Sequence, residues 1–215
     1  MVLLGAMAAV GRWAWPGSDV PNAEHWVRRA FLAPDQVLVE AGQRLGTNVL
    51  PGLRRVMIRD DTRWERLVHS DWVWDLPSFL QRLVPLRLTA AGRFAGASWL
   101  WQQVPGHRAW YPELLPDAFD PSTRNRATLV EWIGRDPGTR SARLEDFLRL
   151  AGDPDPEVRR AAATVMGEAV VQGDAGARTP EFRRTLEKLS SDQVAVVREV
   201  AVLALGGRTR ATEFE

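Results

Sequence analysis

The chain contains no cysteine among its 215 residues. This absence excludes disulfides, thiolate metal sites, iron–sulfur clusters and cysteine nucleophiles, and it favours a reducing, cytoplasmic compartment. Histidine is also scarce, because His25, His69 and His107 are the only three and show no metal-ligand spacing. A Gly-rich phosphate loop, a nucleophile elbow and a dinucleotide motif are all missing. We therefore expect no metal ion, no cofactor and no conventional hydrolase chemistry.

Charge of one sign and long apolar runs are lacking as well. The 28 basic and 27 acidic residues give a net charge of +1, which is too balanced to indicate a nucleic-acid partner from the overall field. Lys188 is the only lysine, so nearly every cation is an arginine, which can pair bidentately with a carboxylate. The apolar run at residues 1–11 is too short to span a bilayer and no basic residue precedes it. We expect a packed first helix there, with a weak signal or membrane-surface segment as the alternative, and no membrane partner.

The C-terminal part of the chain contains an internal repeat. A spacing of 39 positions relates each residue of one set to its counterpart in a second set, namely Asp153, Val158, Arg159, Ala162 and Gly167 to Asp192, Val197, Arg198, Ala201 and Gly206. In both sets an aspartate turn precedes a helix with an apolar stripe, and Asp155 before Pro156 suits a helix N-terminus. Each unit is thus predicted to be helix, aspartate turn, helix and loop.

These units resemble the HEAT family of α-helical repeats, an armadillo-like α-solenoid family, most clearly over residues 141–206. The resemblance implies an all-α fold, a right-handed α-solenoid of HEAT-like helical hairpins in which neighbouring units stack. It also implies that Arg159 and Arg198 bond turn carboxylates across adjacent units. The residues for which it implies a structural role in the repeats are Asp153, Asp155, Val158, Arg159, Ala162, Asp192, Val197, Arg198 and Ala201.

The N-terminal half is helical in pattern but irregular. Fainter matches to the repeat occur around Asp120 to Ala127 and around Val37 to Gly46, so this half is either an array of degenerate repeats or a distinct helical domain. We expect a Trp-rich helical region at 1–104, a Pro-rich connection at 105–121, HEAT-like repeats at 122–206 and a polar tail at 207–215. The helices expected in the first region span 23–32, 35–45, 51–59, 62–68, 77–83 and 89–103.

Two surfaces of the N-terminal half are candidate binding sites. The ten tryptophans all lie between residues 13 and 132, several of them two positions apart, and such neighbours point about 200° from each other on a helix. Filling gaps between irregular helices is the interpretation we favour for most of them, whereas Trp99 and Trp101 are candidates for partner contact. Arg55, Arg59, Arg63 and Arg66 follow helical spacing and form either a solvated, internally paired face or a ridge that binds anions or a phosphate backbone.

Two functional hypotheses follow. The leading one is a non-enzymatic protein–protein interaction or scaffold module, which binds a protein partner or a second copy through the apolar C-terminal helix at 193–205, because solenoid ends normally need a polar cap. The alternative is a nucleic-acid-binding enzyme like the HEAT-like DNA glycosylases that remove alkylated bases. Trp72, Trp74 and Asp75 faintly resemble the Trp-rich, aspartate-containing helix of those enzymes, in which the aspartate would stabilise the oxocarbenium-like centre; capping a helix is the plainer role for Asp75. A basic, Trp-lined face would favour the DNA hypothesis, and a mixed or apolar face would favour protein binding.

Overall fold

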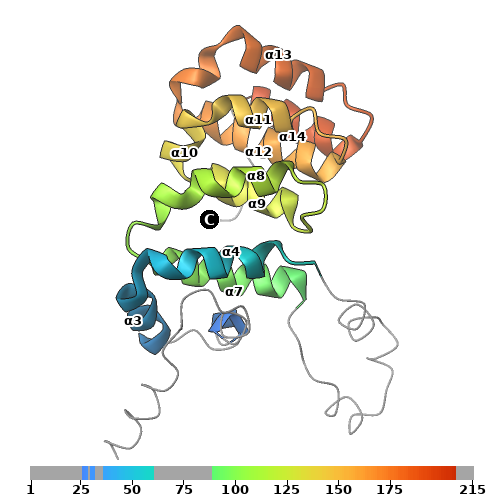
Figure 1. Ribbon diagram of the computed structural model, residues 1–215. Coiled ribbons are helices and arrows are strands. Elements are labelled where there is room, and N and C mark those ends of the chain that lie inside the picture. Colours follow the sequence, from blue (N-terminus) through green and yellow to red (C-terminus); the bar gives the residue numbers. More distant parts are fainter. Residues whose placement is uncertain (1–25, 29, 32–35, 61–88, 207–215) are drawn as a thin grey trace, which may run out of the picture. The chain divides into compact units, whose positions relative to one another are not determined.

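The structure is a computed structural model that describes residues 26–28, 30–31, 36–60 and 89–206 (Figure 1). Within these ranges every regular element is a helix and none is a strand, which confirms the all-α, solenoid-like fold. The handedness of the superhelix stays a prediction. The chain divides into two compact units, residues 1–107 and 108–215.

The described part of the first unit is built on α3 (Gln36–Leu45), η1 (Gly46–Val49), α4 (Leu50–Ile58) and α7 (Ala90–Gln102). Helix α4 packs along α7, and α3 contacts α7 as well. Thr89 begins α7, because its hydroxyl accepts a hydrogen bond from the Gly92 amide at 3.0 Å. These helices match three of the expected ones, residues 26–28 and 30–31 are also helical, and the helices expected at 62–68 and 77–83 lie outside the described residues.

The second unit contains a longer series of helices. After η3 (His107–Leu114), which starts at the boundary, come α8 (Leu115–Phe119), α9 (Arg126–Gly134), α10 (Pro137–Ala142), α11 (Leu144–Leu150), α12 (Pro156–Gln172), η4 (Ala175–Arg178), α13 (Pro180–Leu189) and α14 (Ala195–Leu205). The proline-rich stretch at 105–121, expected as a connection, is largely helical here. Pro116 lies in the first turn of α8, where its missing N–H costs no intrahelical hydrogen bond.

The helices of the second unit pair and then stack. Helix α8 packs on α9, α11 on α12, and α13 on α14, while α12 lies between α9 and α14 and contacts both extensively (Figure 1). Val158 and Val197, which are 39 positions apart, are each the third residue of their helix and are fully buried. The repeat detected in the sequence is therefore a repeat of the structure.

Two close contacts pack α9 against α12 and η3 against α9. A Cβ atom at Gly134 would lie 2.3 Å from Cγ2 of Val165, so the backbone of α9 rests directly on a side chain of α12. At the start of the same unit, the rings of Tyr111 and Trp132 meet edge to face, with centroids 5.0 Å apart and planes at 80°. Both aromatic residues are buried, so η3 covers one side of α9.

Candidate functional site

The second unit builds the same aspartate turn three times. In each turn an aspartate carboxylate accepts a hydrogen bond of 2.9 Å from the backbone N–H two residues later: Asp120 from Ser122, Asp153 from Asp155, and Asp192 from Val194. Six positions after each aspartate stands an arginine, namely Arg126, Arg159 and Arg198. Arg126 is the first residue of α9, Arg159 is the fourth residue of α12 and Arg198 is the fourth residue of α14. Each arginine therefore stands near the start of its helix, at the same distance from the aspartate of its turn.

Arg159 links two consecutive turns. Its Nη1 donates to the carbonyl oxygens of Asp153 and Pro154 in its own turn, at 2.8 and 3.0 Å. Its Nε and Nη2 donate to the two carboxylate oxygens of Asp192 in the next turn, at 2.8 and 2.9 Å. The hydrogen bond from Arg159 is the main reason that the pKa of Asp192 lies below its ordinary value, and the same bond raises the pKa of Arg159. This is the contact between adjacent units that the sequence predicts.

Arg126 makes the preceding link. Its Nη1 donates to one carboxylate oxygen of Asp153 at 3.2 Å and its Nη2 donates to the other. Its Nε donates to the carbonyl oxygen of Ala118 at 2.9 Å. Both members of the Arg126–Asp153 pair are almost completely enclosed by protein. Two successive arginines thus each hold a carboxylate of the following turn.

Arg198 repeats only half of this arrangement. Its Nη1 donates to the carbonyl oxygens of Asp192 and Gln193 at 2.8 and 3.0 Å, the same distances as at Arg159. In the part of the chain that the structure describes, Nε and Nη2 of Arg198 have no carboxylate partner. The guanidinium group is therefore oriented by the carbonyl oxygens of its own turn.

The apolar residues beside these arginines show the same contrast. At four and seven positions after the arginine, α9 has Val130 and Ile133 and α12 has Ala163 and Met166, and all four side chains are fully buried. The corresponding residues of α14 are Val202 and Leu205, which are 55% and 38% exposed. We call Arg198, Val202 and Leu205 the open face of α14. The opposite side of α14, with Val197, Val200, Ala201 and Ala204, is buried, so the helix that the sequence shows as apolar nearly all round has one covered side and one exposed side.

A second arginine network was not found from the sequence. Arg140 in α10 is completely buried, and its Nε and Nη2 donate to Asp174 and Gln172, both at 2.7 Å. Its Nη1 donates to the carbonyl oxygen of Gly134 at 2.9 Å and lies 3.5 Å from Glu168. Burial raises the pKa of Glu168, although Arg140 opposes the shift. Because the guanidinium is saturated with partners, this network fixes α10 against the end of α12 and has no donor to offer a ligand.

Half of the predicted arginine ridge falls outside the described residues. Arg55 is exposed on α4, and Arg59 follows that helix and is half-buried. The backbone carbonyl of Arg59 accepts a hydrogen bond of 2.9 Å from the buried Arg93. Arg63 and Arg66 lie outside the described residues, so a basic ridge stays a prediction.

The predicted tryptophan contacts divide in the way that their spacing requires. Trp101 is only 1% exposed and belongs to the core of the first unit, whereas Trp99 is half-buried and keeps some accessible surface. Of this pair, only Trp99 keeps accessible surface, and its contact with a partner stays a prediction. The residues of the glycosylase alternative, Trp72, Trp74 and Asp75, lie outside the described residues.

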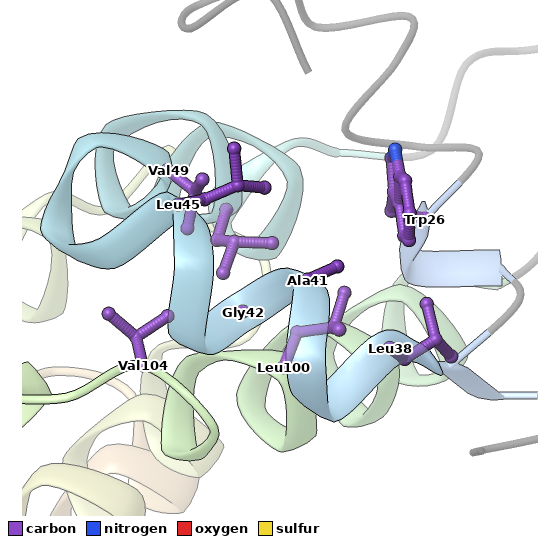
Figure 2. A pocket seen from close by; sticks show the side chains of 9 residues that line it. Trp26, Leu38, Ala41, Gly42, Leu45, Val49, Leu100 and Val104 are labelled. Atoms are coloured by element: carbon purple, nitrogen blue, oxygen red, sulfur yellow. The ribbon is translucent and has the colours of Figure 1, made fainter. Parts of the chain in front are cut away.

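The first unit contains a small apolar cavity between α3, α4 and α7. Figure 2 shows Leu38, Ala41 and Leu45 of α3 on one side of it and Leu100 and Val104 on the other. Its volume is about 10 Å³, close to the minimum for a single water molecule. Small-molecule sites are usually at least about 300 Å³, so this cavity is a packing defect and not a ligand pocket.

The solvent side of α9 and α12 is charged and paired within itself. Arg160 of α12 lies between Glu131 of α9, at 2.9 Å, and Glu157 of its own helix, at 3.0 Å. Glu168 continues the same side of α12, and Glu199 occupies the corresponding position, 39 residues after Arg160, on α14. This side is mixed in charge, and the tryptophan of α9, Trp132, is buried beneath it.

Neither a metal site nor a membrane span is found among the described residues. Within them, no group of three His, Asp or Glu side chains is arranged to hold a metal ion. The same ranges contain no helix with both the length and the apolar character needed to cross a bilayer.

Comparison with known proteins agrees with the geometry of the second unit. Residues 111–206 match the family model of HEAT repeats. These residues form a HEAT-repeat segment. The segment starts in η3, so its first HEAT hairpin includes most of the proline-rich stretch and the turn with Asp120. No curated protein and no solved structure matches the chain.

Proposed function

We propose that the HEAT-repeat segment is a non-enzymatic protein-interaction module and that the open face of α14 is its docking surface. The observation that carries this proposal is the contrast within one register of the repeat. Val130, Ile133, Ala163 and Met166 are fully buried, whereas Val202 and Leu205 are exposed. Exposed apolar side chains at the end of a stack are usually covered by a cap or a partner, because water around them is unfavourable.

The charge of the layer formed by α9, α12 and α14 also favours a protein partner. A surface that binds duplex DNA presents unpaired cations to the phosphates. Here Arg160 is held between Glu131 and Glu157, and the tryptophan of α9 is buried. This side of α9 and α12 is mixed in charge, which supports the protein-binding hypothesis over the DNA-binding one.

Site-specific photocrosslinking in the cells that produce the protein tests this function. We would place a benzophenone amino acid at Val202, on the open face, and as a matched control at Arg184, an exposed position of α13. We expect the probe at Val202 to yield a discrete protein adduct that the probe at Arg184 does not yield. If neither position gives an adduct, or both give the same set, the open face is not a docking surface.

The glycosylase alternative has a separate test. Release of alkylated bases from damaged duplex DNA would be measured for the wild-type chain and for Asp75→Asn. We expect no release by either protein, since the interaction module needs no catalytic aspartate. Release that depends on Asp75 would replace our proposal with the enzymatic one.

A further inference from the structure

We propose that the open face of α14 recognises a helical hairpin of a partner protein whose turn carries an aspartate, and that this carboxylate binds Nε and Nη2 of Arg198. This inference rests on the proposed function and adds the chemistry of the partner. The partner hairpin would pack on α14 as a following HEAT unit would.

The guanidinium group of Arg198 is oriented in the same way as that of Arg159. At Arg159, Nη1 is bound by the carbonyls of its own turn and the remaining fork of Nε and Nη2 grips the carboxylate of Asp192. At Arg198, the carbonyls of Asp192 and Gln193 bind Nη1 at the same distances. The fork at Arg198 is therefore held in the orientation that binds a carboxylate one unit earlier, without a further cost of ordering the side chain.

The carboxylate of Asp192, in the same turn as Arg198, is not available to bind Nε and Nη2 of Arg198. Both oxygens of Asp192 are engaged by Arg159, and one of them also accepts from the Val194 amide. An arginine fork and a carboxylate form two parallel charge-assisted hydrogen bonds, which are among the strongest in proteins. A partner carboxylate is thus the group that the site lacks.

The apolar residues beside Arg198 indicate the shape of the partner. Ala163 and Met166 of α12, on the same side as Arg159, are fully buried, and α12 packs along α14. The open face of α14 repeats this face 39 positions later, with Val202 and Leu205 as the apolar residues. A helix that follows an aspartate turn satisfies both halves of the face at once, as α12 does for Arg126 and as α14 does for Arg159.

A phosphate group would satisfy the arginine but not the rest of the face. Phosphates also bind arginine bidentately, yet they are strongly hydrated and gain nothing from Val202 and Leu205. A carboxylate within an apolar helical surface is the better match.

The first test repeats the photocrosslinking from Val202 with variants of Arg198. We expect Arg198→Glu to lower the adduct yield at least about tenfold, because it replaces attraction by like-charge repulsion. Arg198→Lys should give an intermediate yield, since it keeps the charge but loses the fork. Mass spectrometry should place the adduct on a partner helix that directly follows a turn with an aspartate.

Several outcomes of that test would overturn the inference. They are a yield that Arg198→Glu leaves unchanged, an adduct on a surface without a carboxylate, an adduct on a second copy of this chain, and an adduct on this chain's own residues 207–215. If the adduct persists without dependence on Arg198, the chemistry is wrong while the proposed function survives. If no adduct forms at all, both are wrong.

A second test uses the purified chain and does not depend on a natural partner. A copy of residues 168–206 is inserted between Gly206 and Gly207, which places the copied Asp192 at the same spacing from Arg198 as Asp192 from Arg159. We expect Arg198→Ala to lower the melting temperature of the extended chain by roughly 5 °C more than that of the original chain. Replacing the copied Asp192 by asparagine should remove this difference. If Arg198→Ala lowers the melting temperature equally in both chains, the open face does not bind a carboxylate.

Discussion

At the scale of single residues, Arg159 carries the junction between the last two HEAT units. It bonds two carbonyls of its own turn and both oxygens of Asp192, and it is only 17% exposed. We expect Arg159→Ala to lower the free energy of unfolding by about 2–3 kcal/mol, because it leaves a partly buried carboxylate without its partner.

The matched control for that substitution is Arg183→Ala. Arg183 forms an ion pair with Glu187 on α13 but is 77% exposed, so its loss should cost less than about 0.5 kcal/mol. Urea unfolding followed by circular dichroism would measure both variants. Equal costs would mean that the Arg159–Asp192 pair does not hold the units together.

The same ion pair predicts how stability depends on pH. The pKa of Asp192 is lower in the folded protein than in the unfolded chain, because Arg159 stabilises the charged carboxylate. The resulting stabilisation is complete above the ordinary aspartate pKa of about 4 and is lost as the pH falls through the lowered folded value. Asp192→Asn should therefore be less stable than wild type at pH 7, and the two proteins should converge at pH 2. Melting temperatures between pH 7 and pH 2 would check this, and a constant difference would contradict it.

At the scale of the element, the approach of α9 to α12 depends on a glycine. Since a Cβ atom at position 134 would lie 2.3 Å from Cγ2 of Val165, we expect Gly134→Ala to destabilise the protein by about 1–3 kcal/mol. The double variant Gly134→Ala with Val165→Ala should cost less than the two single variants together, because the added methyl group fills the space that the valine vacates. Strictly additive costs in thermal unfolding would mean that the helices separate rather than repack.

The elements also show how far the sequence could be interpreted. The register of α12 and α14 was predictable because every marker residue recurs after 39 positions. The resemblance to HEAT repeats implied that Arg159 bonds a turn carboxylate of the adjacent unit, and the structure identifies that carboxylate as Asp192. The link from Arg126 to Asp153 was not found, since only 33 positions separate Arg126 from Arg159. The network of Arg140 was not predictable from the repeat for a different reason. Its partners lie at the end of α12 and in the loop after it, where the sequences of the two HEAT units differ.

Candidate site residues were predictable only in part, because their burial depends on which other helices pack against them. The spacing of Trp99 and Trp101 showed that they must face different ways, but burial by α4 and its neighbours decided which one is in the core. The apolar character of α14 was evident from its composition. Which of its sides is exposed depends on where α12 and α13 lie, and this is a property of the packed array.

At the scale of the whole molecule, the end of the array should tolerate what its interior does not. Ala163 and Val202 occupy the same register 39 positions apart, and the first is fully buried while the second is 55% exposed. We expect Ala163→Asp to cost more than about 4 kcal/mol, because it buries an unpaired charge, and Val202→Asp to change stability by less than about 1 kcal/mol.

These two variants also separate folding from binding. Val202→Asp should retain the wild-type circular dichroism spectrum and melting temperature while it loses the photocrosslinked adduct formed from a probe at Leu205. A large loss of stability in Val202→Asp would mean that the open face is covered within the chain itself, which would contradict the docking proposal.

The aromatic pair at the base of the HEAT segment has a practical consequence for spectroscopy. Tyr111 is the only tyrosine of the chain, and its ring lies 5.0 Å from that of Trp132. At this separation an excited phenol transfers its energy to the indole, so the folded hairpin should emit no tyrosine light. Beyond Trp132 the remaining repeats contain neither tryptophan nor tyrosine, so no native fluorophore reports directly on their unfolding. A single tryptophan introduced there would report on the far end of the array as an extra signal against the native background.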